Sequence, residues 1–368
     1  MMFSKRLQIE DGLNPVFSEL QKTRLSGKDI IDLTVSNPTL TGIAYPEILL
    51  QTDFSLKSYQ ADAKGDLTAR EEIANYYNRI YTPEQIVLSS GTSEAYSWLM
   101  KLLCDPGDEI LIPSPSYPLF EMIADLECVK STYYLIQKNA VSWKIDTESI
   151  IKSITAKTRM IILVNPNNPT GMVIAKNDFQ EILDISRRYS IPLVIDEVFS
   201  DYIHQGEYFR PRAEETPVFI LNGISKTLGL PQMKLSWIIV DSENPKYMER
   251  LEIIADTYLS VNLPVQKSLM YMFSMKEIIQ QNINKRISEN LKFIQSLKRK
   301  ELETPQAGWN CLLKLEITNE EDWIMQKIRD GVYAYPGYMF NFAEPGFFSA
   351  SLLLEAEKFA TGINRLLN

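Results

Sequence analysis

Two lysines, eight residues apart, are the residues of this sequence best suited to covalent chemistry. Lys226 and Lys234 lie in a segment that directly follows the apolar run at 218–221. An amine such as that of Lys226 can condense with an aldehyde, and a second ammonium can neutralise a phosphate on the same molecule. Isolated lysines are ordinarily solvated surface charges, so the interpretation depends on the segments that accompany these two.

One of those segments ends in a carboxylate. Asp196 directly follows the apolar run at 192–195. A carboxylate at the end of a buried strand is costly unless a cation or a strong donor meets it. A protonated pyridine nitrogen would be such a partner, and the pairing would help the ring accept electrons. The alternative is an aspartate that caps the next helix.

Two further segments offer donors to a ligand. Residues 89–93 read Ser-Ser-Gly-Thr-Ser before a helical pattern, and a helix N-terminus with hydroxyls suits a phosphate dianion, although a plain N-cap has the same signature. Residues 165–171 read Asn-Pro-Asn-Asn-Pro-Thr-Gly after the apolar run at 160–164. Its prolines stiffen the loop, and Asn168 can present an amide donor.

The elements that must position these residues follow from the hydrophobic pattern. Apolar runs at residues 85–88, 109–112, 160–164, 192–195, 218–221 and 237–240 lack alternation, which is typical of strands covered on both faces. Helical patterns at 93–103 and 178–189 lie between them. This alternation predicts an α/β sandwich with a mostly parallel sheet, in which ligands bind beyond the carboxyl ends of the strands.

The pattern changes after about residue 244. Residues 245–300 indicate long helices interrupted at 262–264, followed by strands at 311–315 and 347–353 and helices at 321–329 and 355–366. We therefore expect a large ligand-binding domain over 45–275. A small α+β domain would comprise 1–44 and 276–368, with the N-terminal arm joining its sheet.

Composition excludes several classes of function. The 368 residues carry a net charge of −9, which argues against a nucleic-acid surface. The single histidine, His204, cannot build a catalytic triad or an ordinary zinc site, and it fits a loop residue. No apolar leader or membrane-length run is present, and the three cysteines (Cys104, Cys128 and Cys311) fit buried thiols in a reducing compartment. We expect a cytoplasmic protein without a metal.

The order of these motifs resembles one enzyme family. Gly91-Thr-Ser, Pro115-Ser-Tyr-Pro, the Asn-Pro-rich loop, Asp196-Glu-Val-Phe and Ser225-Lys-Thr are similar to fold-type I pyridoxal-phosphate aminotransferases of class I/II, the aspartate aminotransferase superfamily. The resemblance extends over about residues 30 to 355. It implies a mostly parallel, seven-stranded sheet sandwiched by helices, a smaller α+β domain, and transfer of an amino group from an amino acid or amine to a keto or aldehyde acceptor.

The resemblance also implies a role for each site residue. Lys226 would hold pyridoxal 5′-phosphate as the internal aldimine and later shuttle a proton, Asp196 would pair with the pyridine nitrogen, and Tyr117 would stack on the ring. Asn168 would bond the phenolic oxygen. The phosphate would be held by Gly91, Thr92, Ser93, Ser225 and Lys234, and by Tyr59 of a neighbouring subunit, which implies a homodimer.

Three positions depart from the family pattern. Phe199 stands where a tyrosine usually bonds the phenolic oxygen, so we expect the aldimine to stay protonated to higher pH, with Tyr202 as an alternative source of the hydroxyl. Lys234 replaces an arginine and loses its bidentate fork. Ser349 stands where an arginine usually binds the substrate carboxylate, which leaves Arg24, Arg210 and Arg212 as candidates or indicates a different substrate.

Two other functions stay open at this stage. The same cofactor supports a carbon–sulfur lyase, a decarboxylase or a racemase, because one carbanion serves all of them. A ligand-sensing domain without catalysis is the second alternative, although no helix-turn-helix precedes the resembling region.

Overall fold

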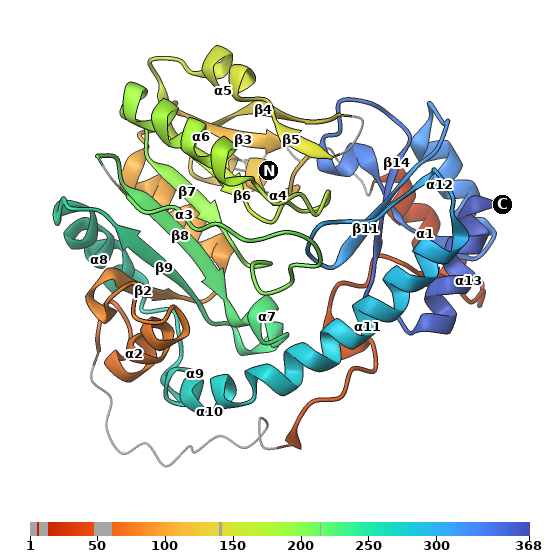
Figure 1. Ribbon diagram of the computed structural model, residues 1–368, viewed down its shortest axis with the longest axis horizontal. Coiled ribbons are helices and arrows are strands. Elements are labelled where there is room, and N and C mark those ends of the chain that lie inside the picture. Colours follow the sequence, from red (N-terminus) through yellow and green to blue (C-terminus); the bar gives the residue numbers. More distant parts are fainter. Residues whose placement is uncertain (1–5, 7–13, 48–60, 140–141, 214) are drawn as a thin grey trace, which may run out of the picture.

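The computed structural model describes residues 6, 14–47, 61–139, 142–213 and 215–368. Its centre is an eight-stranded sheet (Figure 1). In spatial order the strands are β2 (Ile86–Ser89), β9 (Ser236–Asp241), β8 (Val218–Gly223), β7 (Leu193–Asp196), β6 (Thr158–Val164), β3 (Glu109–Ser114), β4 (Lys130–Lys138) and β5 (Trp143–Ile145). All strands except β9 and β5 run in the same direction, which confirms a mostly parallel sheet.

The sheet is buried on both faces, as its unbroken apolar runs predict. Along β6, Ile161 and Leu163 join one hydrophobic cluster, whereas Met160 and Ile162 join a second cluster on the opposite face. This division follows from the two-residue repeat of a strand. Each face therefore needs its own layer of helices.

Those layers are formed by helices that lie before, between and after the strands of this sheet in the chain (Figure 1). Helices α3, α4 and α8 contribute to the cluster of Met160, whereas α2 and α6 contribute to that of Ile161. The helices of this part are α2 (Leu67–Tyr76), α3 (Thr92–Leu103), α4 (Leu119–Leu126), α5 (Thr147–Ser153), α6 (Lys176–Tyr189), α7 (Ile224–Thr227), α8 (Lys246–Tyr258), α9 (Leu263–Lys267) and α10 (Leu269–Ser274), with the 3₁₀ turns η3 (Pro83–Gln85) and η4 (Pro231–Met233). A further 3₁₀ turn, η1 (Pro38–Leu40), lies in the N-terminal arm.

All six apolar runs singled out in the sequence form strands, but the expected strand number was wrong. The sheet has eight strands, because β4 and the three-residue β5 form an antiparallel pair at its edge. Strand β4 is rich in lysine, serine, threonine and tyrosine and is only partly buried, so it lacks the apolar run of the central strands.

The C-terminal half builds a second sheet of four strands. Its order is β10 (Leu302–Glu303), β11 (Asn310–Lys314), β14 (Phe347–Ser351) and β13 (Tyr335–Pro336). The expectation that the N-terminal arm joins this sheet was wrong, because β1 (Ile31–Asp32) pairs instead with β12 (Val332–Tyr333) in a separate two-stranded sheet. The surrounding helices are α1 (Pro15–Leu25), α11 (Lys276–Leu297), α12 (Glu320–Arg329), the 3₁₀ turn η5 (Gly337–Phe340) and α13 (Ala356–Leu367).

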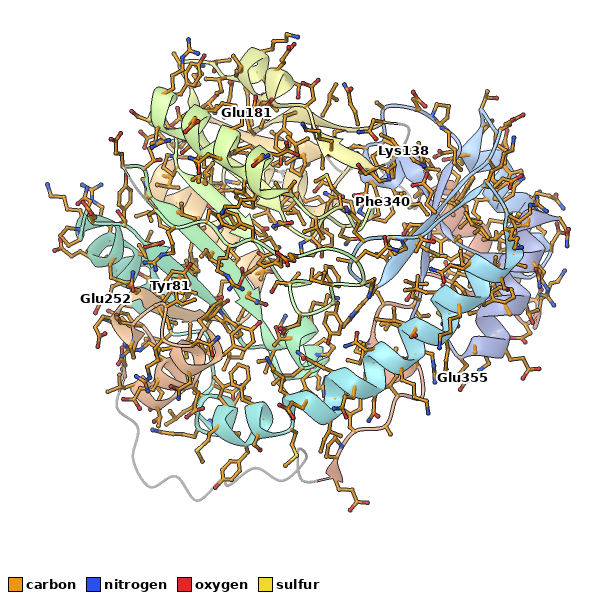
Figure 2. The ribbon with its side chains drawn as sticks, viewed as in Figure 1. Tyr81, Lys138, Glu181, Glu252, Phe340 and Glu355 are labelled. Carbon is orange, nitrogen blue, oxygen red and sulfur yellow. The ribbon has the colours of Figure 1, made fainter. Side chains whose placement is uncertain are left out.

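The two sheets meet along a boundary near the ends of the large-sheet strands. Lys138, at the end of β4, forms an ion pair with Glu303 of β10 across this boundary (Figure 2). Phe340 lies at the same boundary, where its carbonyl accepts a hydrogen bond of 2.9 Å from the Ser116 amide. Among the helices that the structure describes, none has the length and apolar character needed to cross a bilayer.

Candidate active site

Strand register brings the predicted site residues to one edge of the large sheet. Asp196, the last residue of β7, lies opposite Val164 on β6 and Leu221 on β8. The loops that carry Asn168 and Lys226 therefore leave the sheet beside Asp196. On the other side of β8, Ser236 of β9 pairs with both Ser89 and Gly223, which places the segments of Gly91 and Lys234 together.

Asp196 is a buried carboxylate with two hydrogen-bond donors. The Tyr96 hydroxyl donates to Oδ2 over 2.7 Å, and the Val198 amide donates to Oδ1 over 3.1 Å. Burial raises the pKa of Asp196 to about 6, against the opposing effect of these two donors and of the Lys226 charge. The carboxylate is thus ionised at neutral pH and poised to accept one strong cationic donor.

Lys226 lies on the short helix α7, three residues beyond Gly223. A Cβ on Gly223 would lie 2.2 Å from Ser236 Oγ, so only glycine allows β8 and β9 to approach this closely before the chain turns into α7. Burial lowers the pKa of Lys226 to about 8, while the nearby Asp196 charge acts in the opposite direction. A lysine with this pKa supplies neutral amine far more readily than a solvated lysine does.

Aromatic rings surround the Lys226 amine. Its Nζ lies 5.0 Å from the ring centroid of Trp309 and 5.7 Å from that of Phe199. These two rings also contact each other edge to face, at 5.5 Å between centroids. Trp309 comes from the segment before β11, so both sheets contribute to the surroundings of the lysine.

The N-terminus of α3 and Lys234 form an electropositive corner. Helix α3 begins at Thr92 without a side-chain cap, so its first backbone N–H groups are available to an anion. A Cβ on Gly91 would lie 3.6 Å from Lys234 Nζ, which places that ammonium beside the helix start. Lys234 is exposed and makes no ion pair within the described part of the chain. Thr92, Ser93 and Ser225 likewise have hydroxyls without a partner there.

Asn168 and Tyr117 border the same region. Asn168 Oδ1 accepts a hydrogen bond of 2.8 Å from Asn310 Nδ2, at the start of β11. Tyr117 precedes α4, and its ring contacts that of Phe120, which also contacts Tyr96, the donor to Asp196. Burial and then the charge of Asp196 raise the pKa of Tyr117. The structure therefore gathers every predicted site residue that it describes. Tyr59 lies outside the described residues.

The family model for aminotransferase class I and II matches residues 28–366. The chain belongs to this family. Members of the family depend on pyridoxal phosphate. This chain has the expected fold, a mostly parallel sheet between helices, which solved aminotransferases share.

Curated relatives and solved structures agree with this assignment. Glutamate-pyruvate aminotransferase AlaA of Escherichia coli (strain K12) is 31% identical over 268 residues, which cover 69% of this chain and 66% of that protein. AlaA of Haemophilus influenzae is 32% identical over 268 residues, with the same coverage of 69% and 66%. The aligned part thus falls just short of two thirds of these relatives' length.

The solved structures are similar over nearly their whole length. An aminotransferase from Escherichia coli has a TM-score of 0.87 at 24% identity and covers 99% of this chain and 97% of its own. The alanine aminotransferase from Pyrococcus furiosus also has a TM-score of 0.87 at 24% identity, with coverage of 99% and 98%. At this level of identity the likeness establishes the fold.

The residues present fit pyridoxal phosphate. Lys226 would supply an amine for its aldehyde, Asp196 a carboxylate for its ring nitrogen, and the α3 corner with Lys234 a site for its phosphate. Two buried polar atoms beside this region, Ser116 Oγ and Trp309 Nε1, have no partner among the described residues. Such unpaired donors are costly in a closed core and are expected next to a ligand.

The departures from the family pattern have structural counterparts. Tyr202, the alternative source of the hydroxyl that Phe199 lacks, is fully buried, and its hydroxyl donates to the Lys226 carbonyl over 2.8 Å. Ser349 lies within β14, opposite Leu312 and Tyr335, and is also buried. The hydroxyl that Phe199 lacks is therefore not replaced by Tyr202.

The three arginines considered for the substrate carboxylate are all paired with acids. Arg24 lies 2.7 Å from Asp32. Arg210 lies 2.7 Å from Glu197, and Arg212 lies 2.8 Å from Asp241. Each guanidinium therefore already has a carboxylate partner in the described part of the chain.

Three contributors to the site escaped the sequence analysis. Tyr96 had a usable signal, because it follows Thr92 by four residues and so lies one helical turn above the start of α3. Trp309 and Asn310 had none, because they lie more than eighty residues beyond Lys226 and join the site only through packing of the second sheet.

Proposed function

We propose that this protein transfers an amino group between an amino acid or amine donor and a keto or aldehyde acceptor. Bound pyridoxal phosphate would supply the electron sink for this reaction. The observation that supports the proposal most is that strand register brings the end of β7, with the buried carboxylate of Asp196, beside β8, which leads directly into Lys226 on α7.

Each residue of the site has a role in this proposal. Lys226 would hold the cofactor through its Nζ and would move a proton at that atom. Asp196, held by Tyr96, would pair with the pyridine nitrogen, and Tyr117 would contact the ring. Asn168 would donate to the phenolic oxygen. The phosphate would be bound by Gly91, Thr92, Ser93, Ser225 and Lys234, and the proposal adds Tyr59 of a neighbouring subunit.

Two buried aromatic rings line one side of the reacting centre. Phe199 and Trp309 are both almost fully buried beside Lys226 Nζ. An apolar surface of this kind limits the access of water to Nζ.

The direct test is a half-reaction with single amino donors. The protein, loaded with pyridoxal phosphate, is mixed with each donor, and the cofactor form and the keto product are measured by absorbance and chromatography. The proposal predicts one keto product per converted site, with the cofactor recovered as pyridoxamine phosphate. Multiple turnovers without an acceptor, with the cofactor unchanged, would indicate the lyase, decarboxylase or racemase alternative. Binding without turnover of any amine would indicate a sensing domain.

The proposal includes two domains and two subunits. The large domain over 45–275 and the small one over 1–44 and 276–368 are supported by the position of the eight-stranded sheet within residues 86–241.

Exposed apolar residues on α2, α8 and α10, including Leu67, Ile253 and Tyr271, support a homodimer. Light scattering tests the homodimer, because a monomer at micromolar concentration would contradict it.

The proposed location is the cytoplasm. The three cysteines are all unpaired, with Cys311 buried on β11 and Cys104 partly buried. Free thiols are typical of reducing compartments. Fractionation of the producing cells tests this part of the proposal.

A further inference from the structure

The contact between Asn310 and Asn168 joins the two sheets at the cofactor end of the site. Asn310 begins β11 in the four-stranded sheet, and Asn168 follows β6 in the large sheet, yet their amides lie 2.8 Å apart. We propose that Asn310 is a positioning residue that fixes the amide orientation of Asn168, and that it thereby tunes the proton affinity of the bound cofactor. This inference rests on the proposed function, since it requires pyridoxal phosphate in the site.

The contact decides which end of Asn168 meets a ligand. A side-chain amide has an oxygen acceptor and a nitrogen donor that exchange places on a half-turn of the side chain. Asn310 Nδ2 donates to Asn168 Oδ1, which fixes the oxygen end of the Asn168 amide toward Asn310. Asn168 Nδ2 points the other way and has no hydrogen bond within the described residues. Asn168 is partly exposed, so that donor is accessible. Without Asn310, the oxygen end of Asn168 would be equally free to turn to the ligand.

Asn310 is itself held in place. Its backbone pairs with that of Ser351 on β14, and its neighbours Trp309 and Cys311 are buried. The Trp309 carbonyl also accepts a hydrogen bond of 2.7 Å from the Leu352 amide. The donor that orients Asn168 is therefore carried on a rigid strand, which limits the loss of side-chain entropy on forming the contact.

The local donors make Asn168 important for the charge on the cofactor. Phe199 has no hydroxyl, and that of Tyr202 is engaged by the Lys226 carbonyl. An N–H from Asn168 would stabilise negative charge on the phenolic oxygen of the cofactor. It would therefore lower the pH at which the bound cofactor loses the proton held next to that oxygen. The titratable groups of the site beside the Asn168–Asn310 contact are Lys226 on α7, Asp196 at the end of β7, and Tyr117 before α4. Within the described residues, none of these groups forms a hydrogen bond with either asparagine.

The test measures the pH midpoint of the visible absorbance change of the loaded protein. We expect Asn310→Ala to raise the midpoint by about one pH unit, because Asn168 loses its fixed orientation. Asn168→Ala should raise it at least as far, and Asn310→Ala in that background should add no further shift. Asn282→Ala is the matched control. It removes a side-chain amide that lies outside the site and donates to the Ala44 carbonyl at 3.0 Å, so the midpoint of this variant should equal that of the wild type.

A second variant guards against misfolding. Asn310→Asp keeps the shape of the side chain but has no N–H donor, so it should also raise the midpoint. The added negative charge can itself shift the midpoint, and that shift is measured by introducing Asn310→Asp into the Asn168→Ala variant. Wild-type midpoints in both Asn310 variants, or in Asn168→Ala, would overturn the inference. A wild-type protein that binds no pyridoxal phosphate would instead overturn the proposed function.

Discussion

The Tyr96 hydroxyl lies 2.7 Å from Asp196 Oδ2, one hundred residues further along the chain. The pKa of Tyr96 is raised well above its ordinary value by burial and then by the Asp196 charge, so the phenol remains a donor. This contact fixes the carboxylate that is to face the ring nitrogen. It also couples α3, which begins at the phosphate corner, to the end of β7.

Tyr96→Phe should therefore weaken cofactor binding. Loss of the hydrogen bond raises the pKa of Asp196 above about 6, so less of the carboxylate is ionised near neutral pH. We expect the dissociation constant for pyridoxal phosphate to rise about tenfold at pH 6.5 and less at pH 8. Tyr134→Phe is the control, because its buried hydroxyl donates to the Ile162 carbonyl instead. Equal losses in the two variants, independent of pH, would contradict the role of Tyr96.

The pH dependence of cofactor attachment should reflect the lowered pKa of Lys226. Only the neutral amine attacks an aldehyde, and burial lowers this pKa from 10.5 to about 8. The attachment rate of the cofactor-free protein should rise with pH through about 8 and level off above it. Stopped-flow absorbance measures this rate. A rate that keeps rising tenfold per pH unit up to pH 10 would show that Lys226 titrates as a solvated lysine.

Lys234→Ala should reduce affinity for the phosphate group while leaving the reaction type intact. A charged hydrogen bond contributes about 1.5–3 kcal/mol, so the dissociation constant of the cofactor should rise roughly 10- to 100-fold. Lys298→Ala is the matched control, because Lys298 is also exposed and also has a positive φ, 49° against 52° for Lys234. Lys234→Arg should retain most of the affinity. An unchanged constant in Lys234→Ala would remove this residue from the phosphate site.

Arg210 should matter for stability and not for substrate affinity. It bonds Glu197 with distances of 2.7 and 3.1 Å, and Glu197 is fully buried. Arg210→Ala leaves that carboxylate with fewer donors and should lower the free energy of unfolding by about 3 kcal/mol. Urea unfolding measures this loss, and the KM of the amino donor should stay within twofold. A large rise in KM without loss of stability would return Arg210 to the substrate site.

The sequence identified the parts of this protein that depend on local pattern. The six apolar runs became strands, and motifs at strand ends, such as Asp196 and Lys226, lie at one edge because parallel strands bring their carboxyl ends together. The polar edge strands β4 and β5 carried too weak a pattern to be singled out, and the expected number of seven strands came from the family resemblance. The pairing of β1 with β12 depends on tertiary packing that local sequence does not encode.

The candidate site was predictable to the same extent. Residues in the strand-end motifs were found, whereas Trp309 and Asn310 come from the second sheet and have no local signature. The effect expected of Phe199 on the pH at which the cofactor loses its proton stays a prediction. The buried position of its ring, and the engagement of Tyr202 elsewhere, keep that prediction in force.

The most direct measurement is borohydride reduction of the loaded protein, followed by peptide mass spectrometry. Reduction makes a Schiff-base linkage permanent, so the account predicts a phosphopyridoxyl group on Lys226 and no labelled lysine in Lys226→Ala. Asp196→Asn should still be labelled, but with slower amino-group transfer, because it lacks the charge that holds the ring proton. Labelling of another lysine in the wild-type protein, with Lys226 unmodified, would contradict the account.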